Sequence, residues 1–345
     1  MEQTEKARKI EEKALSLGFE RCGIIKVEAM KGYDEKLARR VERFPEMSGA
    51  ISFLRILANP TDKFPWGRSI VVCSLRYGVY RFPENLNGRI GKFYQCDMRH
   101  DENSNGYWAG VLLERYLRDD LGLMTTSAKE SWATADRWAA MTAGLGVIRR
   151  NNFFYGDHGS YYVLSTFLID EELELIHTPA VESCPDKCDL CAKSCPTCSL
   201  AGPYATNMLT CVSRLTTMER DNGTFEKHGH EIGGWIYGCD VCQDVCRFNR
   251  GELSGENDFP GLSELGEAIS ADKVLRMDYG YLRDVISPKF WYIGPDDVWK
   301  WKRNAINAIL NDNDEHSEER IAAARDDEDE RVRAFAKAAL ERFAQ

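Results

Sequence analysis

Hydrophobic residues in the first half of the chain follow two patterns, a helical spacing and short apolar runs. At the N-terminus, Ala7, Ile10, Ala14 and Leu17 recur every three or four residues in a charged background, which is typical of an amphipathic helix. Short runs of β-branched and apolar residues instead predict buried strands. The pattern predicts strands at residues 21–27, 69–77 and 161–169, and helices at residues 30–44, 49–58, 107–121 and 134–144.

The C-terminal part repeats the helical spacing three times. Residues 301–310, 318–325 and 329–343 each carry apolar residues every three or four positions. The pattern D-x-x-x-x-V-R-x-x-A-x-x-A-L resembles HEAT-type helical repeats, which stack as a solenoid and commonly serve as docking surfaces. The acidic run at residues 326–330 precedes the last helix, where negative charge is favourable beside the helix dipole.

Cysteines between residues 184 and 246 indicate the chemistry. Two runs have the spacing C-x2-C-x3-C, and three further cysteines accompany them. Iron–sulfur clusters need soft thiolate donors, four for each cubane, presented by short turns. If Cys198 is set aside, eight cysteines remain between residues 184 and 246, and two [4Fe–4S] clusters require eight. The predicted cluster ligands are Cys184, Cys188, Cys191, Cys195, Cys211, Cys239, Cys242 and Cys246.

The spacing also suggests how the eight thiolates divide. In two-cluster ferredoxins, the last cysteine of a run ligates the other cluster. One predicted cluster therefore has the ligands Cys184, Cys188, Cys191 and Cys246. The other has Cys195, Cys211, Cys239 and Cys242. The position of Cys184 is irregular, because the interval to Cys188 is C-x3-C where a ferredoxin has C-x2-C.

Structural zinc and disulfides are the alternatives for these cysteines. Zinc prefers two clean CxxC pairs for each site, and the Cys195-Pro196 pair is typical of ferredoxins. Disulfides need an oxidising compartment, and the charged, amphipathic N-terminus has no features of a secretory signal. Since no apolar run approaches the length of a membrane span, a cytoplasmic protein is expected. Cys73, within an apolar strand, is interpreted as a buried structural thiol.

The net charge of the chain indicates whether a nucleic-acid partner is expected. The 345 residues carry a formal charge of −10, and the sequence pI is about 5.3. A protein that binds nucleic acid mainly through phosphate contacts usually has a basic surface. The acidic balance therefore counts against a nucleic-acid substrate, although it leaves room for a local basic patch.

A glycine turn at Gly144-Leu145-Gly146 follows the helix predicted at residues 134–144. Two interpretations are open. The turn could bring its backbone close to a phosphate-type group, or Gly144 could simply terminate the helix. The second interpretation is favoured, because glycine is the usual residue after a helix end.

Taken together, several motifs resemble the epoxyqueuosine reductases, cobalamin- and iron–sulfur-dependent enzymes of tRNA queuosine synthesis that are related to the reductive dehalogenases. The similarity runs nearly end to end. The motifs are FPWGRSIVVCSLRY, the AGLG-x-I-x-x-N turn with the later Gly-Ser pair, CPTCSLAGPY, CVSRLTT, WIYGCDVCQDVC and the C-terminal helical repeat.

This resemblance implies an architecture and cofactors. It implies an α/β fold with an α+β, nitroreductase-like cobalamin-binding domain at residues 1–178. A ferredoxin-like module with two [4Fe–4S] clusters would follow at residues 179–255, and a helical region with a HEAT-like repeat at residues 256–345. Cobalamin would have no protein histidine ligand, since D-x-H-x-x-G is missing and the six histidines form no ligand set.

The resemblance also implies site residues. By position in the family motifs, Glu130 replaces an aspartate that serves as proton donor. A glutamate keeps the carboxyl group but moves it by one methylene, and a solvated residue at a helix start is the alternative. The expected cobalamin contacts are Cys96, Gly144, Leu145, Gly146, Asn151 and Ser160.

Other departures from the family gather near the same pocket. Arg149-Arg150 replaces Gly-Lys, Met98-Arg99-His100 replaces Asp-Tyr-His, and Cys198 replaces a glycine. The cysteine pattern, in contrast, is intact. Retained clusters beside a changed pocket are the expected pattern for a family member or paralogue with an altered substrate.

Three hypotheses follow. The first is reduction of epoxyqueuosine in tRNA, with Glu130 as acid and with an external low-potential electron donor; Trp291, Lys300, Lys302 and Arg303 would contact the anticodon arm. The second is a paralogous corrinoid reductase that removes a halide or an oxygen from a small molecule; the acidic charge and the altered pocket favour it. The third is an electron carrier or corrinoid-reducing partner without catalysis. A monomer without membrane attachment is expected in each case.

Overall fold

The fold is that of a computed structural model, which describes residues 2–202, 204–218, 223–312 and 314–343, without the side chains of Ala128 and Glu130. A four-stranded antiparallel sheet lies at its centre, in the order β1-β2-β6-β3. The strands are β1 (Arg21–Lys26), β2 (Ser69–Arg76), β3 (Thr125–Ser127) and β6 (Tyr162–Ile169). β4 (Val147–Ile148) and β5 (Phe154–Tyr155) form a separate hairpin. The three predicted strands are confirmed, and β3 is an addition.

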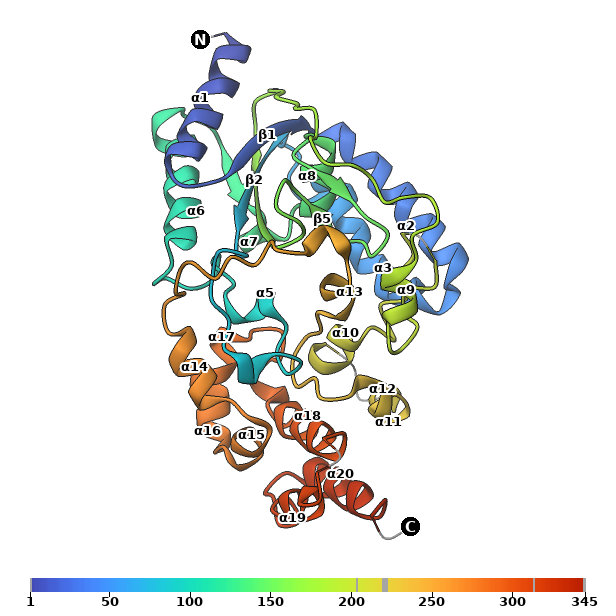
Figure 1. The fold of residues 1–345 in the computed structure, drawn as a ribbon. Coiled ribbons are helices and arrows are strands. Elements are labelled where there is room, and N and C mark those ends of the chain that lie inside the picture. Colours follow the sequence, from blue (N-terminus) through green and yellow to red (C-terminus); the bar gives the residue numbers. More distant parts are fainter. Residues whose placement is uncertain (1, 203, 219–222, 313, 344–345) are drawn as a thin grey trace.

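Both faces of the sheet are covered by helices, which explains the almost continuous apolar runs of β2 and β6. In β2, Val71 and Cys73 face one core, which α1 and α6 complete, whereas Ile70 and Val72 face the other core, which α8 completes. Figure 1 shows α1 and α6 on one side of the sheet and α8 on the other. The buried position of Cys73 agrees with a structural thiol.

The predicted helices of this domain are present, although their ends differ. The N-terminal helix, α1, buries the expected Ala7, Ile10 and Ala14. The expected helix at residues 107–121 is α6 followed by a wider turn at Tyr116–Asp120. The helices are α1 (Gln3–Ser16), α2 (Lys31–Arg43), α3 (Ser48–Arg55), α4 (Pro60–Lys63), α5 (Lys92–Gln95), α6 (Asn105–Arg115), α7 (Ala128–Ser131) and α8 (Asp136–Thr142).

The segment that contains the nine cysteines consists of short helices joined by turns, and it lies between the α/β domain and the C-terminal helices (Figure 1). Its own small core surrounds Val212, Leu215, Phe225 and Trp235. The helices are α9 (Leu190–Ser194), α10 (Val212–Thr217), α11 (Thr224–Lys227), α12 (Gly229–Ile232) and α13 (Val241–Asp244).

The described residues of the C-terminal region form helices joined by turns and loops. The three predicted helices correspond to α18, α19 and α20, and α18 packs against both α15 and α20. The helices are α14 (Leu262–Ala268), α15 (Ala271–Arg276), α16 (Tyr279–Tyr281), α17 (Ser287–Lys289), α18 (Trp299–Leu310), α19 (Ser317–Ala322) and α20 (Glu330–Leu340). In the described part of the chain, no helix has the length and apolar character needed to cross a membrane.

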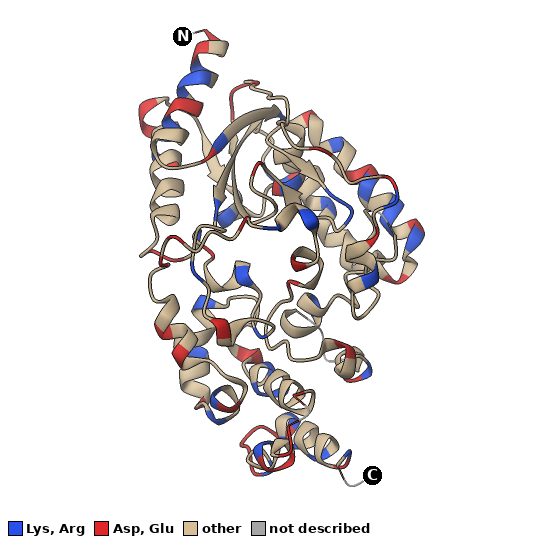
Figure 2. Cartoon of the chain, in the orientation of Figure 1, with Lys and Arg blue, Asp and Glu red and all other residues tan. Residues whose placement is uncertain are grey.

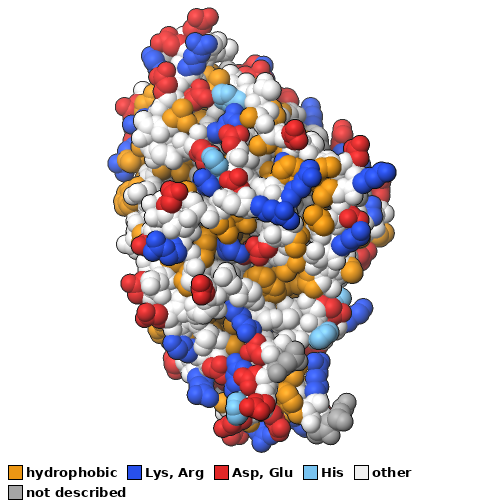
Figure 3. All heavy atoms as spheres, viewed as in Figure 1, with side chains coloured by type: hydrophobic (Ala, Val, Ile, Leu, Met, Phe, Trp, Pro, Cys, Tyr) orange, Lys and Arg blue, Asp and Glu red, His pale blue; other side chains and the backbone are white. Residues whose placement is uncertain are grey.

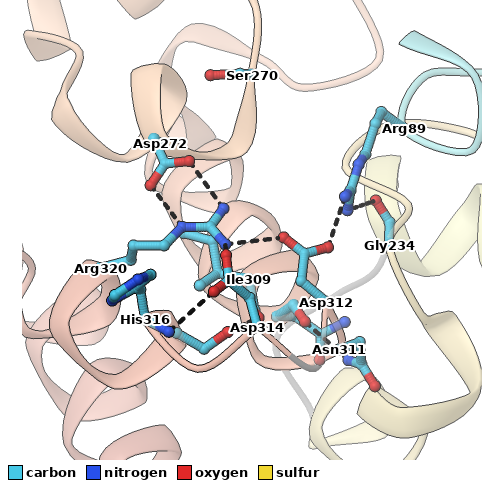
Figure 4. Close-up of polar contacts among 12 residues, drawn as sticks. Arg89, Gly234, Ser270, Asp272, Ile309, Asn311, Asp312, Asp314, His316 and Arg320 are labelled. Atoms are coloured by element: carbon cyan, nitrogen blue, oxygen red, sulfur yellow. Dashed lines mark hydrogen bonds and ion pairs between the residues drawn. The ribbon is translucent and has the colours of Figure 1, made fainter. Parts of the chain in front are cut away.

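A polar network fixes these helices to the rest of the chain (Figure 4). Arg320 forms two hydrogen bonds of 2.8 Å with the carboxylate of Asp272 and ion pairs with Asp312 and Asp314. Asp312 in turn accepts from Arg89, which also donates to the carbonyl of Gly234 beside the cysteine segment. The network therefore connects all three parts of the molecule.

Candidate functional site

The two C-x2-C-x3-C runs adopt matching conformations and lie against each other. Each run forms one short helix, α9 in the first and α13 in the second, and these two helices are in contact. α9 ends directly before Cys195 and α13 ends two residues before Cys246, and in each case the amide of the last cysteine donates to a carbonyl three residues back, that of Ala192 or Gln243. This pairing brings thiols that are about fifty residues apart in sequence into one region.

The first predicted ligand set is assembled in the structure. Cys184, Cys188, Cys191 and Cys246 line a single pocket, together with Tyr155 and other side chains. Burial is the main cause that raises the pKa of Cys191 to about 11, and the neighbouring thiols of Cys184, Cys188 and Cys246 contribute to this rise. Cys184 and the first two cysteines of one run therefore lie beside the last cysteine of the other run, and their role as ligands of one cluster stays a prediction.

The second set is assembled in the same way. Burial raises the pKa of Cys239 well above its ordinary value, and the thiols of Cys211 and Cys195 add to the rise. Burial also raises the pKa of Cys242, with contributions from Cys239, Cys211 and Cys195 and also from Cys191 of the first set. The four thiols therefore lie within electrostatic range of one another.

These groups suit clusters better than a single ion. Within the described residues, no three His, Cys, Asp or Glu side chains are close enough together to hold one metal ion. Each iron of a cubane takes one thiolate, so the four sulfurs around a cubane stand farther apart than those around zinc. Eight thiols in two groups of four fit two [4Fe–4S] clusters. Cys198 is exposed and has a φ of 52°, apart from both sets.

Two of the expected cobalamin contacts instead hold the cysteine segment against the α/β domain. The Asn151 amide donates to the Tyr155 hydroxyl (2.9 Å) and to the carbonyl of Cys242 (3.1 Å). The Ser160 hydroxyl donates to the Gln243 side chain (2.8 Å). Since both side chains are buried, they fix α13 relative to β6. A contact with cobalamin stays a prediction for them.

The other four expected contacts are also buried. Cys96 and Leu145 belong to the two cores of the α/β domain. Gly144 has a φ of 73° directly after the end of α8, and a side chain there would collide with the carbonyl of His177. A side chain at Gly146 would meet the Tyr155 carbonyl. The structure thus supports the interpretation of Gly144 as a helix-terminating residue.

Glu130, the predicted acid, lies in α7, and its side chain is outside the part that the structure describes. Its neighbours fix this short helix in place. The hydroxyl of Ser131 donates to the Ser127 carbonyl (2.7 Å), and Lys63 donates to the Ser131 carbonyl (2.9 Å). Trp132 follows with a φ of 51°, which is rare for a bulky residue. The role of Glu130 stays a prediction.

A buried ionic network lies close to this loop. Arg99 forms two hydrogen bonds of 3.0 Å with the carboxylate of Asp97 and approaches Asp136 to 3.7 Å. Asp136 also accepts from Thr166 at 2.9 Å. Although burial opposes it, the charge and hydrogen bonds of Arg99 lower the pKa of Asp97, whereas burial raises the pKa of Asp136. Arg99, a departure from the family motif, therefore has two carboxylate partners, the buried Asp97 and the partly exposed Asp136.

Aromatic rings line the same region. Trp291 stacks on Tyr292 with a centroid distance of 3.8 Å and contacts both His100 (5.0 Å) and Trp132 (6.1 Å). Trp132 also contacts Phe53 and remains 44% exposed. Loops from residues 97–100, 130–136 and 291–292 thus meet, and their planar side chains can contact a planar ligand.

The predicted tRNA contacts on α18 are wrong. Lys300, Lys302 and Arg303 are 5%, 6% and 0% exposed, respectively. Lys302 pairs with Asp327 at 2.8 Å, Lys300 pairs with Asp297, and Arg303 donates to the carbonyl of Leu215. These cations stabilise the helical region, because buried charges require such partners. In Figure 2, basic and acidic residues alternate along these helices.

The sequence reasoning did not identify Asp97, Asp136 or Trp132 as site residues. The spacing of Asp97 and Arg99 was a usable signal, since carboxylate and guanidinium two residues apart in a turn can pair. Asp136 comes from a distant segment, and its approach to Arg99 depends on the pairing of β2, β6 and β3. Nothing in the sequence indicated the positive φ of Trp132.

Comparisons with known proteins agree with this arrangement. Residues 184–249 match the family described as a 4Fe-4S double cluster binding domain. An epoxyqueuosine reductase of Cellulophaga algicola is 29% identical over 255 residues, which are 70% of this chain and 78% of the relative. One from Prochlorococcus marinus is 26% identical over 86% of this chain and 95% of the relative.

The fold is also that of solved epoxyqueuosine reductases. A crystal structure of epoxyqueuosine reductase with an epoxyqueuosine-modified tRNA-Tyr stem loop superposes with a TM-score of 0.73, at 21% identity and 99% coverage of both chains. In sequence this chain is therefore a relative of the epoxyqueuosine reductases, and it carries their mixed α/β fold and a 4Fe-4S double cluster binding domain.

Proposed function

We propose that this chain is a reductase that converts epoxyqueuosine in tRNA to queuosine. The observation that carries this proposal is the position of the cysteines: two groups of four thiols lie directly against the α/β domain that contains the Glu130 loop. Relatives that cover most of the chain are epoxyqueuosine reductases, and a solved neighbour holds the modified tRNA stem loop. The paralogue and electron-carrier hypotheses lack a comparable observation.

The proposed reaction consumes two electrons and two protons. Both carbon–oxygen bonds of the epoxide break, a carbon–carbon double bond forms, and the oxygen leaves as water. The electrons come from an external low-potential donor through the two clusters, since each [4Fe–4S] cluster carries one electron at a time. Glu130 would deliver a proton to the leaving oxygen, a role that requires its carboxyl group within hydrogen-bond distance of that oxygen.

Cobalamin is the proposed second cofactor, and when bound it would supply a reduced cobalt centre for electron transfer to the substrate. The aromatic group of Trp132, Trp291 and Tyr292 suits a planar macrocycle, and Arg99 adds polar contact beside it. The nitroreductase-like assignment of residues 1–178, the module at residues 179–255 and the HEAT-like region at residues 256–345 are part of this proposal. So are a monomeric state and a cytoplasmic location.

The test is an anaerobic assay of the protein reconstituted with iron, sulfide and cobalamin. A low-potential reductant and tRNA that carries epoxyqueuosine are added, and queuosine is quantified by mass spectrometry of the digested nucleosides. We expect queuosine to form only when both cofactors are present. If cobalamin is reduced while the tRNA is unchanged, the substrate is a small molecule. If the protein fails to bind cobalamin, the electron-carrier hypothesis replaces the proposal.

A further inference from the structure

Three basic side chains are gathered where α2 meets α8. Lys36 and Arg40 are one helical turn apart and therefore share a face of α2. Lys36 lies over the ring of Trp138 at 5.8 Å, and Trp138 follows Arg137 in α8. Tyr33, on the same face of α2, also contacts the Trp138 ring, at 6.1 Å. We call Lys36, Arg40 and Arg137 the cationic cluster.

No acidic side chain in the described residues forms an ion pair with the cationic cluster. Two other cations of this region do form ion pairs: Arg39 with Glu35 at 4.0 Å, and Arg55 with Asp34 at 3.5 Å. The Nε atom of Arg40 is buried and has no hydrogen-bond partner. A desolvated guanidinium nitrogen without an acceptor is costly, so its retention suggests an acceptor supplied from outside the chain.

The positive charges of the cationic cluster also repel one another. Burial, with smaller contributions from the charges of Arg137 and Arg40, lowers the pKa of Lys36 to about 8. Burial lowers the pKa of Arg40 too, with Arg137 adding to the effect. Like charges one turn apart destabilise a helix. Without a ligand, repulsion among these charges therefore lowers the stability of the folded chain. A bound anion would offset this repulsion.

The location connects the cationic cluster to the candidate site. Arg137 donates to the Asn152 carbonyl at 2.5 Å, and its charge influences the pKa of Tyr292 in the aromatic group, where burial is the main effect. On the other side, Leu37 of α2 belongs to a core completed by Met208 and Leu209 of the cysteine segment. The cationic cluster thus lies near the interface between the α/β domain and the cysteine segment. Figure 3 shows hydrophobic side chains across the middle of one face, with charged residues bordering them.

We propose that Lys36, Arg40 and Arg137 bind a phosphodiester group. Guanidinium groups match phosphate oxygens with two parallel hydrogen bonds, and an ammonium adds a point charge. A phosphodiester occurs in two of the proposed ligands, the nucleotide loop of cobalamin and the tRNA backbone. The proposal rests on the proposed function for its choice of ligands, but the site itself is a property of the chain alone.

The test compares Lys36→Met and Arg40→Met with Lys31→Met, which removes an exposed charge from the same helix. Cluster-loaded protein is titrated with cobalamin, with cobinamide, which lacks the nucleotide loop, and with a tRNA anticodon stem loop at several salt concentrations. Loss of one charged hydrogen bond weakens binding about tenfold. A tenfold loss for cobalamin alone identifies the cofactor phosphate. Weaker stem-loop binding identifies the RNA backbone, provided that the slope of log binding constant against log salt concentration also becomes smaller in magnitude by about 1.

The same variants have a second readout that does not depend on activity. Without ligand, Lys36→Met and Arg40→Met should raise the Tm relative to Lys31→Met, because repulsion is relieved. If the Tm falls and cobalamin, cobinamide and stem loop bind as in the parent, the cationic cluster is structural and the proposal is overturned. Equal weakening toward cobalamin and cobinamide also contradicts it. If the phosphodiester contact is present but epoxyqueuosine is not reduced, only the proposed function fails.

Discussion

The cysteine segment and the region beside α7, which is the proposed substrate pocket, differ in how their residues are brought together. All eight predicted ligands lie within residues 184–246, and local turns set most of their positions. The proposed pocket instead combines Arg99, Trp132, Asp136 and Trp291 from three separate segments. The first region has fixed spacings because a cubane accepts few ligand geometries. The second depends on the whole fold, so single substitutions there can change the substrate without affecting the clusters.

Removal of a ligand that joins the two runs should have the largest effect. Cys246→Ala would take one thiolate from the set of Cys184, Cys188 and Cys191. We expect the iron content to fall from about eight to about four atoms per chain, with loss of activity. Iron analysis and electron paramagnetic resonance of the reconstituted protein measure this effect. Cys198→Ala is the matched control, and equal iron loss in this control would contradict the assignment.

Replacement of the proposed acid tests the pocket without touching the clusters. Glu130→Gln removes the proton but keeps the size of the side chain, and we expect kcat to fall by about 100-fold or more. Iron content and thermal stability should be unchanged. Glu130→Asp restores the family residue and should keep activity. An unchanged rate in Glu130→Gln would assign the proton to another group.

The buried network should show how strongly the pocket depends on Arg99. Arg99→Met leaves the buried carboxylate of Asp97 and the partly exposed carboxylate of Asp136 without this counter-charge, which should cost about 3 kcal/mol of unfolding free energy, the lower end of the range for a buried pair. Arg99→Lys should lose less, since the charge remains. Denaturant unfolding of the cluster-loaded proteins measures both values.

The network also predicts a pH dependence. In the parent protein, Arg99 lowers the pKa of Asp97 against the opposing effect of burial, so this stabilisation is complete above the ordinary pKa of aspartate. It is lost as the pH falls through the lower, folded-state pKa. In Arg99→Met, the main opposition to burial is lost, and only the backbone amide at position 99 and His100 still lower the pKa of Asp97. The pKa should therefore rise, so the loss of unfolding free energy relative to the parent should be largest at neutral pH and smaller toward pH 5. If the loss of unfolding free energy in Arg99→Met grew as the pH fell, this explanation would be contradicted.

The smallest effect is expected far from both regions. Arg320→Met removes the partly exposed ion pairs that connect α15, α18 and α19 (Figure 4). We expect a loss of about 1 kcal/mol, and less at high salt. Arg325→Met, at an exposed position in the same region, is the control. A change in tRNA affinity without a change in stability would assign Arg320 to binding instead.

The fold was more predictable than the pocket. Periodicity identified β1, β2 and β6 and the last three helices, because each buries a regular set of apolar residues. Periodicity also fails in an instructive way at α18. Lys300, Lys302 and Arg303 were expected at the surface, but charged residues can be buried when carboxylates such as Asp327 meet them from other helices. That pairing is decided by tertiary contacts, which the local pattern does not contain.

The most direct test of the central claim is a single-turnover experiment. The reconstituted protein is reduced, freed of excess reductant and mixed with tRNA that carries epoxyqueuosine, while cluster oxidation and queuosine formation are followed together. We expect the clusters to be oxidised as queuosine appears, with two electrons consumed for each epoxide. Queuosine formation with clusters that remain reduced, or cluster oxidation that the tRNA neither triggers nor accelerates, would contradict an electron relay to the tRNA epoxide.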